Sequence, residues 1–379
     1  MGFLKLTSIV IASILFAMSV TPASYGGVKL GIEVLLESPS YQKMLEGKRL
    51  GLITNPTGVD SKFNSTIELL YEHPKLNLCA LFAPEHGLRG ERSAGEWVQQ
   101  SIDKKTQLPV YSLYGKSKKP TGKMLEKIDV LIFDIQDIGV RTYTYISTLF
   151  LIMEAADGEG KEVFVLDRPN PLGGVNVEGP VLKPEYKSFI GMLEIPLIHG
   201  MTIGEIAMLI KGENKMKLKL TVVPMEGWRR DMVWEDTGLF WVPTSPHIPT
   251  PTSAFLYATT GTIGSRNLSN GVGYTLPFQL IGSEWISPFE FIEKLNSKNI
   301  PGVRFQSCWF KPFYSIFKDK TLKGVRFILT DSKSFKPVRT ALEILTTLES
   351  LYPGIYEPPQ DFNKIWGVDY ILTEIKKRK

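Results

Sequence analysis

Short apolar runs alternate with segments of helical spacing along most of this chain, and this alternation restricts its fold more than any other feature. Runs without strict polar alternation predict strands buried on both faces, and they occur at residues 49–54, 76–84, 108–114, 128–135 and 162–167. Helical patterns separate these runs, and the longest of them ends in Gly158 and Gly160. Strands that alternate with helices predict an α/β fold with a doubly wound parallel sheet.

The segment 242–252 interrupts this pattern and predicts a domain boundary. It reads VPTSPHIPTPT, and a stretch so rich in Pro, Ser and Thr disfavours regular structure. Beyond it, the segments FIEKLNSK, GVRFILT and ALEILTTLESLY are consistent with a second, smaller α/β domain. We therefore expect residues 27–241 to form the larger domain and residues 253–379 to form the smaller C-terminal one.

The N-terminus has the pattern of a secretory signal peptide. Lys5 precedes the apolar run LTSIVIASILFAMSV, and the small residues of TPASYGG follow it. The run is shorter than the roughly 20 apolar residues that a membrane span needs, although a retained membrane anchor is the alternative. We expect residues 1–25 to be removed, which leaves an exported protein, periplasmic or extracellular, without a stable membrane span.

Charge and motif content argue against several classes of function. The formal net charge is only +5, and the basic residues form no long run apart from the C-terminal KKRK, so we expect no nucleic-acid partner. Cys79 and Cys308 predict two unpaired, buried thiols, and with four histidines they supply few metal ligands. Glycine patterns for dinucleotide or phosphate binding are missing, as is the G-x-S-x-G turn of serine hydrolases.

Polar side chains follow four of the predicted strands, at the ends where parallel sheets bind ligands. In chain order they are Asn55; Glu85, His86 and Arg89; Asp134, Gln136, Asp137, Arg141 and Tyr143; and Asp167, Arg168 and Asn170, with Glu178 shortly after. A single acid at a strand end often serves only as a helix cap or a turn former. The convergence of four such ends, rather than any one residue, indicates a functional site.

Paired carboxylates are the groups in this set that suggest a reaction. Cleavage of a glycosidic bond needs a protonated acid at the leaving oxygen and usually a second carboxylate or an equivalent base. Glu85 is the best candidate for the acid, because it follows a buried strand and Pro84, where partial burial favours a protonated carboxyl group. The neighbouring His86 could orient Glu85 or share its proton, and a packed loop histidine is the alternative.

Several long segments resemble a single enzyme family. They are GLITNPTGVD, ALFAPEHGLRG, VYSLYG, DVLIFDIQDIGVRTYTYIST, VLDRPNPLGG, VEGPVL, HGMTIGE and VVPMEGWRR, and the resemblance as a whole covers the chain from about Leu50 to Tyr352. With these segments the chain resembles the exo-acting β-N-acetylmuramidases, glycoside hydrolase family 171. The resemblance implies a Rossmann-like larger domain, a smaller C-terminal domain and an active-site cleft between them. It also implies release of terminal N-acetylmuramic acid from the non-reducing end of peptidoglycan fragments, with no metal or organic cofactor.

The family motifs imply roles for individual positions of this chain. The catalytic candidates are Glu85, His86, Asp134 and Glu178. The substrate-binding candidates are Asn55, Arg89, Gln136, Asp137, Arg141, Tyr143, Asp167, Arg168, Asn170, His247 and Asn267. Three positions depart from the family pattern: His247 replaces an asparagine, Gly264 a glutamate and Val272 an arginine. If this part of the chain contacts substrate, we expect the departures to change specificity or activity.

The substrate implied by the resemblance carries a lactyl carboxylate, which N-acetylglucosamine lacks. The forked guanidinium of arginine suits such a group best, and Arg141, Arg168 and Arg89 are the candidates. We favour Arg141, with a purely structural role in its loop as the alternative. Tyr143 could stack on a sugar face. The alternative for the whole chain is a non-catalytic protein that binds muropeptides or wall glycan on the same scaffold.

Overall fold

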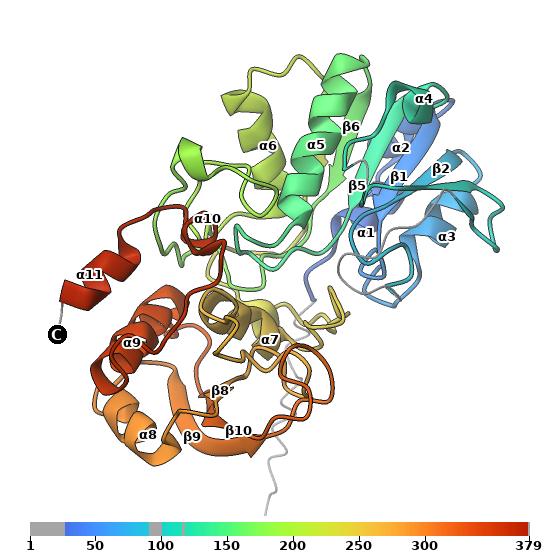
Figure 1. Cartoon of the computed structure of the whole chain (residues 1–379). Helices are drawn as coiled ribbons and strands as arrows, with labels where there is room; N and C mark the ends of the chain where they lie inside the picture. Colours follow the sequence, from blue (N-terminus) through green and yellow to red (C-terminus); the bar gives the residue numbers. More distant parts are fainter. Residues whose placement is uncertain (1–26, 91–100, 116–117, 378–379) are drawn as a thin grey trace, which may run out of the picture.

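Two sheets organise the part of the chain that the structure describes. The computed structural model describes residues 27–90, 101–115 and 118–377, so the predicted signal peptide at 1–25 lies outside the described residues. One sheet has seven strands and the other has three, and each belongs to its own layered unit (Figure 1). Residues 242–250 contain no helix or strand and connect the two units.

The larger sheet has the strand order of a Rossmann fold. Its strands are β1 (Arg49–Thr54), β2 (Asn77–Ala83), β3 (Ser101–Ile102), β4 (Pro109–Ser112), β5 (Val130–Asp134), β6 (Glu162–Leu166) and β7 (Leu220–Val223). They lie in the order β3-β4-β2-β1-β5-β6-β7, and every neighbouring pair is parallel except β3 and β4. Without the short edge strand β3, this is the doubly wound order 3-2-1-4-5-6, whose switch point lies between β1 and β5. The predicted fold class is confirmed.

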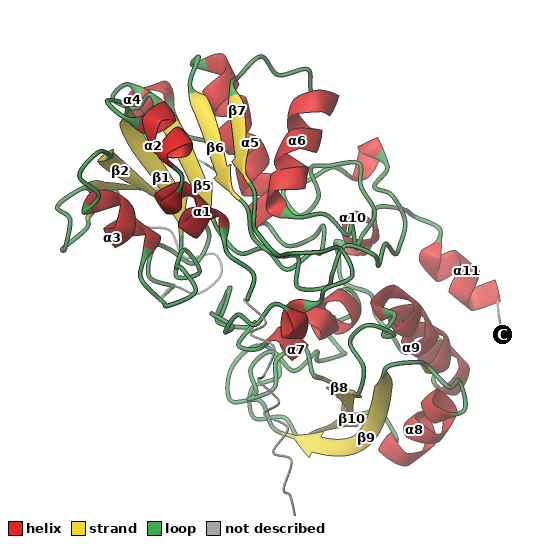
Figure 2. Ribbon diagram, turned by 180° about the vertical axis from the view of Figure 1, so that it is seen from behind, coloured by secondary structure: helices red, strands yellow, loops and turns green. Residues whose placement is uncertain are grey.

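Helices cover both faces of the larger sheet (Figure 2). On one face lie α1 (Gly31–Glu37), α2 (Pro39–Leu45) and α3 (Thr66–Tyr71); on the other lie α4 (Gly122–Leu125), α5 (Tyr145–Gly158) and α6 (Ile203–Glu213). Because both faces are covered, every residue of β5 is buried, which explains the unbroken apolar runs of the sequence. Thr202 and Glu205 form the capping box at the start of α6 that their spacing predicts.

The smaller unit is an antiparallel sheet covered by helices. Its strands β8 (Leu280–Ser283), β9 (Val303–Phe310) and β10 (Leu322–Leu329) lie in the order β8-β10-β9. The helices are α7 (Pro251–Leu256), α8 (Pro288–Asn296), α9 (Pro337–Leu351), α10 (Phe362–Trp366) and α11 (Ile371–Lys377). One face of the sheet packs on α8 and α9, so β9 starts with alternating buried and exposed residues. Short helical turns occur at Pro184–Tyr186 and Trp234–Asp236, and a π-helical turn, at Tyr257–Gly261, follows α7 directly.

Two further expectations from the sequence concern the whole chain. Cys79 and Cys308 are free thiols, as predicted, but each is partly exposed rather than buried. Within the described ranges, no helix combines the length and the apolar character that crossing a membrane requires.

Candidate active site

The loop between β5 and α5 joins the larger unit to the smaller one. The hydroxyl oxygen of Tyr143 lies 2.7 Å from Thr244 Oγ1, and the hydroxyl of Tyr145 donates a hydrogen bond of 2.6 Å to the Thr244 carbonyl oxygen. Thr142 Oγ1 lies 3.2 Å from the hydroxyl oxygen of Tyr257, which follows α7. The tyrosine-rich motif after the fourth predicted strand therefore forms a junction between the two units.

Glu85 lies in the loop after β2 and is held by this junction. Thr144 Oγ1, between the two junction tyrosines, donates a hydrogen bond of 2.8 Å to Glu85 Oε2. Pro84 is buried, whereas Glu85 itself is only partly buried. The carboxyl group is thus fixed in orientation by a neutral hydroxyl while part of its side chain stays accessible. This combination suits a group that exchanges a proton with a ligand.

His86 and His247 approach this region from different units. His86 has a backbone φ of 70°, a left-handed conformation that is uncommon for residues with a side chain and that concentrates at functional sites. Burial, together with repulsion from His86, lowers the pKa of His247. The two imidazoles are therefore electrostatic neighbours, and the structure brings both to the region of Glu85.

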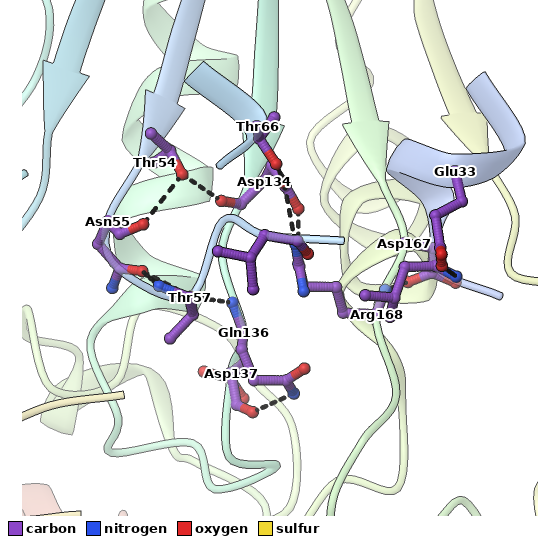
Figure 3. A network of polar contacts seen from close by, with 12 residues as sticks. Glu33, Thr54, Asn55, Thr57, Thr66, Asp134, Gln136, Asp137, Asp167 and Arg168 are labelled. Atoms are coloured by element: carbon purple, nitrogen blue, oxygen red, sulfur yellow. Dashed lines mark hydrogen bonds and ion pairs between the residues drawn. The ribbon is translucent and has the colours of Figure 1, made fainter. Parts of the chain in front are cut away.

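Asp134 forms a buried ion pair with Arg168 at the ends of β5 and β6. Arg168 Nε and Nη2 donate hydrogen bonds of 2.5 and 3.0 Å to the two carboxylate oxygens, and Thr66 Oγ1 donates another of 2.6 Å (Figure 3). Both side chains are almost completely buried. This geometry does not support the predicted catalytic role of Asp134 or a lactyl contact by Arg168, because each group is already occupied by the other. The pair instead holds two strand ends together.

Three predicted substrate-binding amides are also buried in the framework of the loops. Asn55 Oδ1 accepts a hydrogen bond of 2.9 Å from the backbone of Thr57. Gln136 Nε2 donates to two carbonyl oxygens at 2.7 and 2.8 Å, and Asn170 Nδ2 donates to the Met201 carbonyl oxygen at 3.0 Å. The structure brings these amides together as predicted, and their bonds shape the loops at the switch point. Asn55 and Gln136 are drawn in Figure 3.

Asp167 caps helix α6 rather than facing a ligand. Its carboxylate accepts hydrogen bonds from Thr202 Oγ1 at 2.9 Å and from the backbone of Gly204 at 2.8 Å. A Cβ atom at position 204 would lie 2.8 Å from Asp167 Cγ, so this close approach requires glycine. Burial raises the pKa of Asp167 to about 6. The structure gives Asp167 a structural role at the start of α6, and its predicted contact with substrate stays a prediction.

Arg141 is fully buried and tethers the two units. It donates hydrogen bonds of 2.9 and 2.8 Å to the carbonyl oxygens of Pro180 and Ile195, and one of 3.0 Å to that of Ile365 in α10. Burial lowers its pKa to about 10. A guanidinium enclosed in this way cannot reach a lactyl carboxylate, so the geometry supports the structural alternative.

Glu178 contacts the smaller unit at the start of α9. Glu178 Oε2 accepts hydrogen bonds from the backbone of Val338 at 3.1 Å and of Arg339 at 3.5 Å, and burial raises the pKa of the carboxyl group. An acid at this position complements the positive end of the helix dipole. No contact among the described residues joins Glu178 to Glu85, so the structure favours a helix cap over the predicted catalytic role.

Arg89 and Asn267 complete the predicted set. Asn267 Nδ2 donates to the Ile355 carbonyl oxygen at 2.7 Å, which anchors a loop of the smaller unit. Arg89, four residues after Glu85, pairs with Asp103 at 2.9 Å, and 52% of its side chain stays exposed. Of the three arginines considered for the lactyl group, Arg89 is therefore the one that a ligand can approach.

His199 lies beside the predicted site residue Asp137 but was not singled out from the sequence. Its Nδ1 accepts a hydrogen bond of 3.1 Å from Met201, so the neutral ring carries its proton on Nε2, which lies 4.0 Å from Asp137 Oδ2. Burial lowers the pKa of His199 to about 3 and raises that of Asp137 to about 7. A neutral imidazole thus faces a carboxyl group that titrates near neutral pH. His199 is the first residue of HGMTIGE, one of the segments that carry the family resemblance, and this position could have indicated it as a site residue.

Comparison with known proteins matches the whole described architecture. A family model described as "Exo-beta-N-acetylmuramidase NamZ, N-terminal" matches residues 50–252, and its C-terminal counterpart matches residues 255–379. A peptidoglycan beta-N-acetylmuramidase of Bacillus subtilis is 47% identical over 99% of this chain and 92% of its own length. Two crystal structures of DUF1343 family proteins from Bacteroides fragilis each cover 93% of this chain. The first has a TM-score of 0.86 and 44% identity over 92% of its length, and the second has 0.73 and 28% over 91%.

Proposed function

The chain belongs to the NamZ family of exo-β-N-acetylmuramidases, and from this premise we propose that it is exported and releases terminal N-acetylmuramic acid from the non-reducing end of peptidoglycan fragments. The family relationship confirms the resemblance carried by the sequence motifs, and it makes the protein a glycoside hydrolase that acts on peptidoglycan. The cleavage of terminal residues rests on the description of the family model. Export rests on the N-terminal sequence pattern.

The position of Glu85 is the observation that carries the chemical part of the proposal. Because Glu85 Oε2 accepts the hydrogen bond from Thr144, the acid proton belongs on Oε1. Glu85 donates this proton to the glycosidic oxygen as the bond from that oxygen to the anomeric carbon breaks. Water then adds its hydroxyl group to the anomeric carbon and releases its other proton, and uptake of a proton restores the acid form of Glu85. The Thr144 hydroxyl stabilises the carboxylate that is left.

The proposed function is tested by incubating the purified protein with glycan fragments that end in N-acetylmuramic acid. Mass spectrometry of the products should find the free monosaccharide and a fragment shortened by one sugar. Cleavage at internal bonds would contradict the terminal specificity. Binding without any cleavage would favour the non-catalytic alternative.

Arg89 is our candidate for the lactyl carboxylate. We expect Arg89→Ala to lower the preference for muramic acid over glucosamine glycosides about ten- to a hundred-fold, because a charge-assisted hydrogen bond contributes roughly 1.5–3 kcal/mol. The preference is measured as the ratio of kcat/KM for the two glycosides. Arg304→Ala, at an exposed arginine of β9, is the control. If Arg89→Ala slows both substrates equally, Arg89 has only a structural role, in which its ion pair with Asp103 holds the loop.

Export predicts a shortened mature protein. Lys5, the short apolar run and the small residues after it lead us to expect an N-terminus near residues 24–27 in protein recovered from the periplasm or medium. Mass spectrometry of the intact protein measures this directly. A cytoplasmic protein that begins at Met1 is the contrary result.

A further inference from the structure

A strip of exposed aromatic side chains lies on the loop that follows β9. Phe313 and Tyr314 are 55% and 43% exposed, and their ring centroids are 5.6 Å apart. The ring of Tyr274 lies 6.2 Å from that of Phe313 and extends the strip. Single exposed apolar side chains are common on protein surfaces, whereas clusters of them mark binding sites.

The backbone beneath this aromatic strip is closely packed. The backbone N–H of Phe313 donates a hydrogen bond of 2.8 Å to the Gly273 carbonyl oxygen. Gly273 has a φ of 96°, and a Cβ atom there would lie 2.4 Å from the Tyr314 carbonyl oxygen, so the two loops approach as closely as glycine permits. Ser315 Oγ adds a longer hydrogen bond of 3.4 Å to the carbonyl oxygen of Val272. A surface ordered in advance loses little conformational entropy when a ligand binds.

Tyr314 connects the strip to the region of Glu85. Its hydroxyl lies 2.8 Å from His247 Nε2, and the two rings are stacked with centroids 6.0 Å apart and planes inclined by 20°. Thr244, three residues before His247, is bonded to the tyrosines on either side of the hydrogen-bond donor to Glu85. His247 is also the electrostatic neighbour of His86. Through Tyr314 and His247, the strip is therefore connected to the residues around the proposed acid.

We propose that Phe313 and Tyr314 form the subsite for the second sugar of the glycan, the one that leaves when the glycosidic bond breaks. This inference rests on the proposed role of Glu85. A proton donor acts on the oxygen between two sugars, so the leaving sugar must lie within about one ring of it. A pyranose ring has a face of C–H groups that packs well on aromatic side chains, while its hydroxyl groups can reach polar tips such as the Tyr314 hydroxyl.

Two departures from the family pattern lie at this subsite, one in contact with Tyr314 and one in the loop beneath it. His247, which replaces an asparagine, stacks on Tyr314, and Val272, which replaces an arginine, lies in the loop that supports it. Neither replacement touches the hydrogen bond between Thr144 and Glu85. Both positions therefore adjoin the surface that would hold the leaving sugar.

The test compares a substrate that has a second sugar with one that lacks it. The first is the disaccharide of N-acetylmuramic acid and N-acetylglucosamine, and the second is the methyl β-glycoside of N-acetylmuramic acid. We expect Phe313→Ala and Tyr314→Ala each to lower kcat/KM for the disaccharide about three- to ten-fold, as loss of one aromatic contact does, and to leave the methyl glycoside unchanged. Tyr314→Phe keeps the ring and should retain most of the activity.

Controls separate this inference from the proposed function. Tyr71→Ala removes a similarly exposed ring, 46%, from the end of α3 and should change neither substrate. In a Glu85→Gln background, calorimetry should show weaker binding of the disaccharide when Tyr314 is replaced by Ala, with unchanged binding of free N-acetylmuramic acid. Equal effects on both ligands, or no effect on either, would overturn the subsite. If the wild-type protein cleaves neither substrate, the proposed function fails, and the binding comparison still decides the subsite.

Discussion

Glu85→Gln is expected to lower kcat on peptidoglycan fragments by roughly 10²–10⁴-fold, because the amide keeps the shape of the carboxyl group but cannot donate its proton. The hydrogen bond from Thr144 Oγ1 can still be accepted by the amide oxygen, so the loop should keep its position. Initial rates of release of N-acetylmuramic acid measure the effect.

The matched control for this change is Glu72→Gln. Glu72 is an exposed residue that follows α3, and its replacement should leave the rate unchanged. Circular dichroism and thermal unfolding establish that both variants are folded. Wild-type turnover by a folded Glu85→Gln protein would remove Glu85 from the mechanism.

Arg141→Ala is expected to destabilise the protein on the order of 3–5 kcal/mol, because three hydrogen bonds from a charged donor and the packing of a fully buried side chain are lost together. The change leaves three carbonyl oxygens, one of them buried and two partly buried, without their donor, and opens a cavity at the junction of the two units. Arg141→Lys should lose less stability than Arg141→Ala, because lysine keeps the positive charge. It should still be less stable than the wild type, because a single ammonium group cannot reach all three acceptors. Denaturant unfolding of the purified variants measures the difference in the free energy of unfolding.

Arg49→Ala serves as the control for this second change. Arg49 pairs with Asp129 at 2.7 Å on the surface of the larger unit, with both side chains about 40% exposed, and exposed pairs stabilise little. The Arg49 variant should unfold close to the wild-type midpoint. An Arg141→Ala protein as stable as the wild type would show that the tether is dispensable. It would also reopen the question of a ligand role for Arg141.

The larger fold could be predicted because its sheet is covered on both faces. Residues buried on both faces give long apolar runs, and the predicted strands at 49–54 and 162–167 coincide with β1 and β6 to within a residue. β9 was not predicted, because a strand with one open face mixes exposed residues such as Arg304 with buried ones such as Val303. Its pairing with β10 depends on contacts that are distant in sequence.

The candidate site was predictable in position but not in the direction of each side chain. Strand order brings the ends of β1, β2, β5 and β6 to one edge, so the convergence of their polar residues could be inferred. Whether a strand-end residue faces a ligand or the interior depends on its partner. Asp134 and Arg168 are 34 residues apart in sequence, and only the folded chain shows that they bind each other. The same holds for Arg141, whose acceptors come from both units.

The position of the aromatic strip, unlike that of the candidate site, could not be predicted from the sequence. Phe313 and Tyr314 lie in a segment to which the sequence patterns assign no function, and Tyr314 becomes informative only through its contact with His247, 67 residues earlier. His247 was noted as a departure from the family pattern, yet its effect could not be placed. Substitutions at a ligand site are understood through the residues they touch, which sequence position alone does not reveal.

The role of Glu85 as general acid is tested most directly by changing the leaving group. A dinitrophenolate leaves without protonation, whereas a sugar alkoxide does not, so only the sugar substrate needs the acid. In the Glu85→Gln protein, we predict that hydrolysis of the dinitrophenyl β-glycoside of N-acetylmuramic acid stays near the wild-type rate at the bond-breaking step. Cleavage of the disaccharide should fall by roughly 10²–10⁴-fold. An equal loss on both substrates would contradict the account, because Glu85 would then act on something other than the leaving oxygen.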